Sequence, residues 1–390
     1  MTSPIYFDNA ATSWPKPPAV RSALDAYFGP AGGNPGRSGH RMSIAAARIV
    51  EDARDRLAEL LNVSDPAQIA LTKSATESLN LAIYGILKPG DHAVTTSIEH
   101  NSVMRPLRHL ESTGVEVTVV ACDRYGLLDA AEVRAALRPN TRLIITTHGS
   151  NVVGSVLPIA AVGAIARDAG VPYLVDAAQT AGAIPIDVEA QTLDMVAFTG
   201  HKGLMGLTGT GGLYARDSIA PSPLLRGGTG SRSDLDTQPD FTPDIYESGT
   251  LNVAGFAGLA AGVAHVLRIG PANVETHERA LVARFLAGAE EIPDVTVHGP
   301  ESLLDRCGVL SFNVNSLTPS EVGTLLDQQY DIMSRVGLHC APGAHKTIGT
   351  FPVGSVRFGF SITNSEAEID QALTAVAEIA QWAATRSDRA

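Results

Sequence analysis

The sequence predicts an α/β protein with a large domain, built on a mostly parallel sheet, and a smaller α+β domain. From about residue 17 to about residue 250, apolar strand-like runs alternate with helical patterns. This alternation is typical of a parallel sheet covered by helices on both faces. After two helices that end near residue 290 the pattern changes, and the strands and helices follow a different order. The length of 390 residues is sufficient for two domains.

The strands of the large sheet are expected where short apolar runs are bounded by helical patterns or turn residues. Seven runs meet this condition, at residues 68–72, 92–96, 115–120, 143–147, 171–177, 195–199 and 212–215. Helices are expected where apolar residues recur with helical spacing, at residues 19–28, 44–61, 77–87, 105–112 and 159–169. A loop rich in Gly, Ser, Asp and Pro follows at residues 227–244, and loops of this length are usually functional or lie at an interface.

The rest of the chain is expected to form the smaller domain. Two helices, at residues 252–269 and 271–290, lead into it. Its strands are expected at residues 295–297, 309–314 and 356–360, and its helices at residues 319–329 and 366–383. We therefore predict a large domain of residues 17–270 and a small domain made of residues 1–16 and 271–390.

The composition narrows the classes of function. The chain has 29 Lys and Arg against 41 Asp and Glu, a net charge of −12, which disfavours binding to nucleic acid or to an anionic membrane. The three cysteines are odd in number and form no CxxC pair, so neither a disulfide framework nor a metal site is expected. The N-terminus lacks a signal-peptide pattern, and the most apolar stretch, residues 254–267, is too short to span a bilayer. These features predict a cytoplasmic protein.

Polar clusters follow several of the predicted strands, where parallel sheets bind their ligands. They lie at residues 74–77, 151, 176–179 and 199–202. The last, TGHKG with Lys202, opens a Gly-rich loop but matches neither a P-loop nor a dinucleotide-binding pattern. A hydroxyl-bearing helix start at residues 74–76, the carboxylate of Asp176 and the amine of Lys202 are together what pyridoxal phosphate requires.

The chain resembles the class V pyridoxal phosphate-dependent enzymes of aminotransferase fold type I, and in particular the cysteine desulfurase/selenocysteine lyase family. The resemblance covers nearly the whole length. It is carried by YFDNAAT at residues 6–12, SATESLN at 74–80, EHN at 99–101, SN at 150–151, VDAAQ at 175–179, TGHKG at 199–203, ESGTLN at 247–252, RVGLHC at 335–340 and VRF at 356–358. The chain departs from the family where Thr199 replaces a usual Ser and Leu251 a usual Pro.

The resemblance implies a role for each matching residue. Lys202 would bind the cofactor covalently, His100 would stack on its ring and assist proton transfer, and Asp176 would pair with its ring nitrogen. Asn151 and Gln179 would bind its phenolic oxygen. Its phosphate would be bound by Ala75, Thr76, Thr199, His201 and, from the partner subunit of a homodimer, Thr250. The substrate would be bound by Ala11, Asn151, Arg335 and Arg357.

Cys340 lies in the stretch GLHCAPGAH, between two histidines. A free cysteine in isolation is more often a small buried residue than a reactive one. The resemblance reverses this interpretation: the Cys340 thiolate would attack the sulfur of L-cysteine, and L-alanine and a persulfide would result. Cys122 and Cys307 adjoin strands and are expected to be structural.

Other functions remain open from the sequence. Selenocysteine lyase, a C–S lyase that makes pyruvate, and another class V aminotransferase or epimerase would use the same scaffold. A sulfur-carrier scaffold with little turnover belongs to a different class, which the intact Lys202, Asp176 and Cys340 disfavour. The predicted partners are a small-molecule substrate, L-cysteine or an analogue, and a sulfur-acceptor protein.

Overall fold

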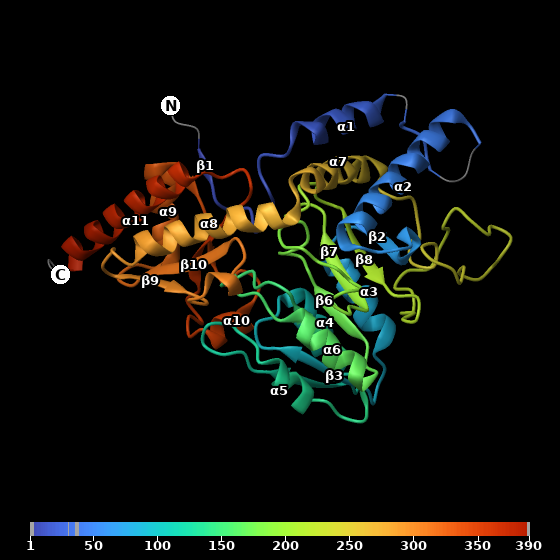
Figure 1. Cartoon of the computed structure of the whole chain (residues 1–390), viewed down its shortest axis with the longest axis horizontal. Helices are drawn as coiled ribbons and strands as arrows, with labels where there is room; N and C mark the ends of the chain where they lie inside the picture. The colour runs from blue at the N-terminus through green and yellow to red at the C-terminus, as the bar shows by residue number, and fades with distance from the viewer. Residues whose placement is uncertain (1–3, 30, 36–38, 388–390) are drawn as a thin grey trace.

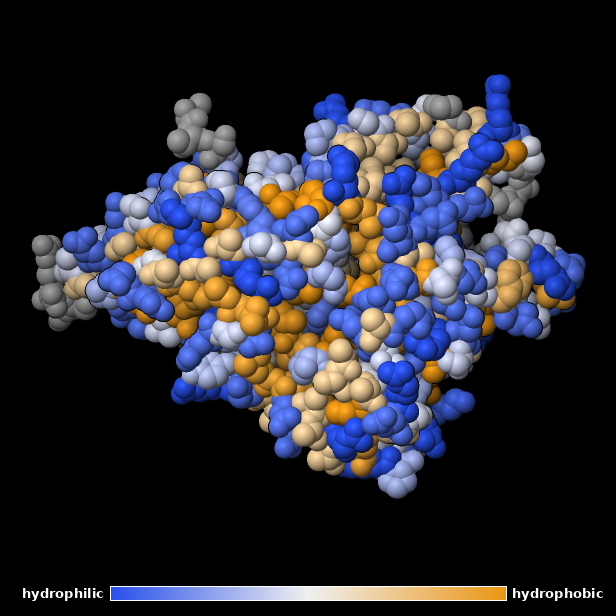
Figure 2. Space-filling model, in the orientation of Figure 1, coloured by the Kyte–Doolittle hydropathy of each residue, from blue (hydrophilic) through white to orange (hydrophobic). Residues whose placement is uncertain are grey.

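The structure is a computed structural model that describes residues 4–29, 31–35 and 39–387. Its two main sheets lie side by side (Figure 1). The smaller one, with α8, α9 and α11, occupies the left of the view, and the larger one the right. Figure 2 shows hydrophilic side chains over the outer parts of this face and hydrophobic ones mainly along the junction below α8.

The large sheet has seven strands in the order β2-β8-β7-β6-β5-β3-β4. The four pairings from β7 to β4 are parallel, and the pairings of β8 with β2 and β7 are antiparallel. The mostly parallel seven-stranded sheet is thus confirmed. Its strands are β2 (Ile69–Thr72), β3 (His92–Thr96), β4 (Glu116–Val120), β5 (Thr141–Thr147), β6 (Tyr173–Asp176), β7 (Met195–Thr199) and β8 (Gly211–Ala215).

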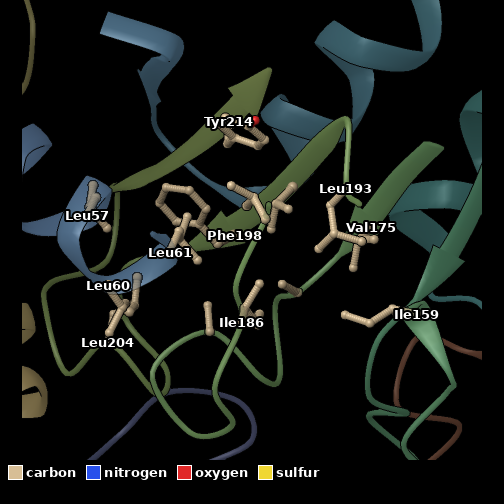
Figure 3. Packing of buried hydrophobic residues seen from close by; sticks show 14 of the residues in the cluster. Leu57, Leu60, Leu61, Ile159, Val175, Ile186, Leu193, Phe198, Leu204 and Tyr214 are labelled. Carbon is tan, nitrogen blue, oxygen red and sulfur yellow. The ribbon is translucent and has the colours of Figure 1, made fainter. Parts of the chain in front are cut away.

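Helices cover both faces of this sheet. Successive residues of a strand point to opposite faces: Val175 packs with Leu57 and Phe198 in one hydrophobic core (Figure 3), whereas Leu174 packs in the other with Leu79. The helices of this part are α1 (Pro18–Phe28), α2 (Arg41–Leu61), α3 (Ala75–Ile86), α4 (Asn101–Glu111), α5 (Ala130–Ala135), α6 (Ile159–Ala169) and α7 (Val253–Ile269). The parallel strands therefore end at one edge with their side chains held from both sides.

The smaller sheet is antiparallel, in the order β12-β13-β10-β9. A core rich in phenylalanine packs it against the helices beside it. The first strand of the chain, β1 (Ile5–Tyr6), pairs in parallel with β11 (Ile332–Met333) in this part. The remaining elements are α8 (Pro271–Ala289), β9 (Val295–His298), β10 (Val309–Val314), α9 (Pro319–Tyr330), β12 (Arg335–Gly337), α10 (Pro342–Thr347), β13 (Ser355–Gly359) and α11 (Glu366–Ser387).

The predicted domain limits, residues 17–270 against residues 1–16 and 271–390, stay a prediction. Residues 1–3, 30, 36–38 and 388–390 lie outside the described part of the chain. Across the described ranges, no single helix is long and apolar enough to span a membrane. The pair α7 and α8 meets that test together by length and composition, but the two helices bend by 79°, and most of α7 is buried.

The sequence missed the shortest elements and placed several helix starts too late, among them those of α2, α3 and α4. Elements α5, α10, β1, β11 and β12 have six residues or fewer, too few to display a hydrophobic period. Helix α4 begins at Asn101, not at residue 105, because the His100 side chain caps it. Helix α3 begins at Ala75, not at residue 77, with Ser74 as its N-cap.

Candidate active site

A pocket lies at the carboxyl ends of the parallel strands of the large sheet. Its walls come from the start of α3, the start of α4 and the turns after β5, β6 and β7. It is lined by Ser74, Ala75, Thr76, Leu79, His100, Ser102, Thr147, Gly149, Asn151, Asp176, Ala178, Gln179, Thr199, His201 and Lys202. The structure thus brings together every predicted cofactor residue except Thr250.

One end of the pocket is suited to an anion. Ser74 caps α3 through a hydrogen bond from the Glu77 N–H to its Oγ, 3.3 Å long, and the free N–H groups of the first turn therefore face this end. The Thr76 hydroxyl lies 2.8 Å from that of Ser102. His201 also lines the pocket, and its Nδ1 is buried without a hydrogen-bond partner among the described residues.

The opposite charges of the pocket are buried. Burial, together with the nearby charge of Arg357, lowers the pKa of Lys202 to about 8, although the charge of Asp176 opposes this shift. Burial raises the pKa of Asp176, while the Ala178 N–H, which donates to Oδ1 at 2.9 Å, and the charge of Lys202 oppose that rise. An amine with such a pKa is partly neutral near pH 8, as a nucleophile or proton acceptor must be.

His100 is held by the helix that it caps. Its Nδ1 accepts a hydrogen bond from the Ser102 N–H at 3.0 Å and lies 2.9 Å from the Ser102 hydroxyl. Burial, followed by the charge of Lys202, lowers the pKa of His100 to about 4. The imidazole is therefore neutral at pH 7, and Nδ1 is the acceptor. Its predicted stacking on the cofactor stays a prediction.

The two predicted amide ligands make contacts that the sequence did not indicate. The Asn151 side chain donates through Nδ2 to the carbonyl oxygen of His339 at 2.6 Å, and Gln179 donates through Nε2 to that of Ala10 at 3.1 Å. Both partners lie more than 150 residues away in the chain, so no local pattern could reveal them. Both amides still line the pocket.

Arg357 and Arg335 face very different surroundings. The Arg357 side chain is only 3% exposed, and it donates to Asp8 Oδ1 at 2.9 Å and to the backbone oxygen of Asn151 at 3.0 Å. Its Nε has no hydrogen-bond partner among the described residues. Arg335 sits opposite it on the neighbouring strand β12, but is exposed. Asp8 belongs to the motif at residues 6–12, but the sequence did not indicate that it orients Arg357. Ala11 is partly buried, and its N–H donates to the backbone of Asp8.

The three cysteines divide as expected from the sequence. Cys122 and Cys307 are buried, and burial raises the pKa of each thiol to about 12. Cys340 is exposed in the turn between β12 and α10. It lines a hollow together with Thr76, His100 and Ser102, which also line the pocket, so the two spaces adjoin.

Thr250 does not reach the pocket of its own chain. It is exposed and lines other hollows, next to Glu247. Glu247 forms a buried ion pair with Arg54, which fixes the segment that carries Thr250. The residues described contain no group of three or more His, Cys, Asp and Glu side chains that could hold a metal ion.

Comparison with known proteins identifies the family. The profile of the Aminotransferase class-V family matches residues 5–372. The chain belongs to this family. It is 36% identical over 385 residues to a probable cysteine desulfurase of Methanothermobacter thermautotrophicus, covering 96% of this chain and 94% of that protein. It is 34% identical to a cysteine desulfurase of Haloferax volcanii, covering 95% of this chain and 88% of that protein.

Solved structures agree with this assignment. The chain is similar to the apo structure of a cysteine desulfurase from Thermococcus onnurineus, with a TM-score of 0.91 and 36% identity over 97% of this chain and 95% of the other. It is also similar to a cysteine desulfurase of Escherichia coli solved in an S-sulfonic acid form, with a TM-score of 0.86 and 30% identity over 97% and 94% of the two chains. The predicted family and fold class are both confirmed.

Proposed function

We propose that the chain is a pyridoxal phosphate-dependent cysteine desulfurase, which transfers the sulfur of L-cysteine to Cys340 and releases L-alanine. The observation that carries the proposal is the position of Cys340. This exposed thiol lines a hollow that shares Thr76, His100 and Ser102 with the pocket of Lys202. An aminotransferase or epimerase would need Lys202 but not a thiol at this opening.

The residues of the pocket fit pyridoxal phosphate. The start of α3 and the unpartnered His201 Nδ1 suit its phosphate, and the buried carboxylate of Asp176 suits a protonated ring nitrogen. Lys202 is a buried amine of lowered pKa, suited to bond an aldehyde. When bound, the cofactor supplies an electron sink that makes the Cα proton of the substrate acidic and weakens its Cβ–S bond.

Side chains of the pocket would then bind the substrate and transfer its protons. Arg357, held by Asp8, would orient the substrate carboxylate through the donors that Asp8 and Asn151 leave free. The Lys202 amine would take the Cα proton, and neutral His100 would assist.

The sulfur transfer needs no added oxidant, because the substrate carbon is reduced as the two sulfur atoms are joined. The Cys340 thiolate bonds to the substrate sulfur as the Cβ–S bond breaks, and the electron pair of that bond stays on Cβ. Cβ takes up a proton and becomes the methyl group of alanine. Cys340 is left as the persulfide.

Product analysis tests this function. L-cysteine should give alanine and, with a thiol reductant, sulfide, whereas a C–S lyase would give pyruvate. Cys340→Ala should lose alanine formation, and the matched control Cys122→Ala should retain it. Pyruvate as the main product, or unchanged alanine formation in Cys340→Ala, would contradict the proposal. The same assay with L-selenocysteine separates a selenocysteine lyase, whose rate would be far higher with selenium.

We also propose a homodimer in which Thr250 of each chain reaches the phosphate site of the other. Its exposed position, away from the pocket of its own chain, supports this, and so do the exposed apolar side chains of its loop, Leu224, Leu225, Leu235 and Phe241. Sedimentation should give a dimer, and a fully active monomer would rule it out. A cytosolic location fits three cysteines that remain free thiols.

A further inference from the structure

The turn that carries Cys340 has an unfavourable backbone. His339 and Cys340 have φ values of 48° and 58°, so two successive residues with side chains lie in the left-handed region. Such a turn persists only if its surroundings hold it. Three hydrogen bonds do so: Asn151 Nδ2 to the His339 oxygen at 2.6 Å, the Asn101 N–H to the Cys340 oxygen at 2.8 Å, and the Ala341 N–H to the Leu338 oxygen at 2.9 Å.

Only the first of these bonds comes from a side chain in the pocket. Asn151 is buried, lines the pocket, and belongs to the turn after β5. Its backbone oxygen accepts from Arg357 Nη1 at 3.0 Å, and its side chain reaches the turn. One residue thus contacts both the arginine suited to the substrate carboxylate and the segment that bears the thiol.

The His339 carbonyl depends on this contact. His339 is buried, and its imidazole is held elsewhere, with Nε2 3.2 Å from the Ser355 hydroxyl. Loss of the Asn151 donor would leave a buried carbonyl unsatisfied, which costs more than an average hydrogen bond contributes. An amide has two N–H groups, so Asn151 can hold the turn with one and still face the cofactor with the other.

We propose that Asn151 is the positioning residue for Cys340 and that it links the Arg357 end of the pocket to the thiol-bearing turn. The link to sulfur transfer rests on the proposed desulfurase function. The positioning of the turn itself does not, because it is a property of the protein without substrate.

Hydrogen–deuterium exchange of the cofactor-loaded enzyme, without substrate, tests the positioning. Asn151→Asp keeps the shape of the side chain but replaces the donor by an acceptor that repels the His339 oxygen. The backbone amides of residues 337–345 should then exchange about tenfold faster. Gln179→Glu is the matched control, because it makes the same chemical change in the same pocket, at a side chain whose native amide donates to the Ala10 oxygen and not to the turn. It should leave exchange in residues 337–345 unchanged.

The outcomes separate the two proposals. The inference is overturned if residues 337–345 of Asn151→Asp exchange at the wild-type rate, or if Gln179→Glu accelerates their exchange equally. If Asn151→Asp does not fold, Asn151→Ala is measured and interpreted in the same way. If the turn loosens but the wild-type enzyme forms no persulfide, only the proposed function fails. If both hold, persulfide formation at saturating L-cysteine should slow about tenfold in Asn151→Asp but less in Gln179→Glu, whose amide is predicted to bind the same cofactor oxygen and does not contact the turn. An unchanged rate would overturn the link to catalysis.

Discussion

The cofactor pocket and the Cys340 turn meet at one opening but are built in different ways. The pocket gathers side chains at strand ends and helix starts, positions that the large sheet fixes by itself. In the turn, two residues have left-handed backbone, at about 1–2 kcal/mol each. Three hydrogen bonds of about 1 kcal/mol each offset a cost of that size. The positions of the pocket residues therefore follow from the sheet, whereas the turn is finely balanced and sensitive to small changes.

The largest effect is expected in the pocket. Lys202→Ala removes the only lysine among the described residues that line it and should abolish the absorbance of covalently bound cofactor. Turnover of L-cysteine should fall by at least about 10²–10⁴-fold, because no other amine can take the Cα proton. Absorbance spectra and alanine assays measure both. Reducible covalent attachment of the cofactor in this variant would show that the pocket is assigned to the wrong amine.

Substitutions of the two arginines on neighbouring strands should differ strongly in their effect on the KM for L-cysteine. Arg357→Lys keeps the charge but loses the fork that contacts Asp8 and Asn151, and the KM for L-cysteine should rise about 10–100-fold. Arg335→Ala, at an exposed position, should raise it less than about threefold. Steady-state kinetics of the two variants measures this. The reverse order would mean that the substrate carboxylate binds outside the buried end of the pocket.

The turn can be disturbed without touching the pocket. A Cβ on Gly343 would lie 2.7 Å from the backbone oxygen of Ser97, so Gly343→Ala must shift the start of α10. We expect a loss of about 1–3 kcal/mol in unfolding free energy and slower persulfide formation, with cofactor absorbance retained. Gly227→Ala, where the new Cβ has room, is the control for both measurements. Normal persulfide formation in Gly343→Ala would contradict the sensitivity of the turn.

The smallest expected effect is the pH dependence of cofactor uptake. Only the neutral Lys202 amine can bond the cofactor's aldehyde, and its lowered pKa is about 8 instead of 10.5. The rate of cofactor uptake by the apoprotein should therefore rise as pH rises through about 8 and level off above it. Stopped-flow absorbance across pH measures this rate. A rate that keeps rising toward the ordinary lysine value would show that the pocket does not shift the pKa of the amine.

The contrast between the cofactor pocket and the Cys340 turn also explains which features the sequence could predict. The strands, most helices and the polar residues at the strand ends follow from local patterns, since Asp176 ends one apolar run and Lys202 lies three residues after another. The contacts that hold the turn do not. Asn151 meets His339 across 188 positions, and Asp8 meets Arg357 across 349. Nor does any pattern in a loop of mixed residues reveal that His339 and Cys340 adopt left-handed backbone.

Cys340, and neither buried cysteine, should receive the sulfur of the substrate. Brief exposure of the cofactor-loaded enzyme to L-cysteine, followed by alkylation and mass spectrometry of its peptides, tests this most directly. We predict one added sulfur on Cys340 and none on Cys122 or Cys307, whose thiols are buried and have pKa values raised to about 12. Added sulfur on either buried cysteine, or alanine formation by Cys340→Ala at the wild-type rate, would contradict the account.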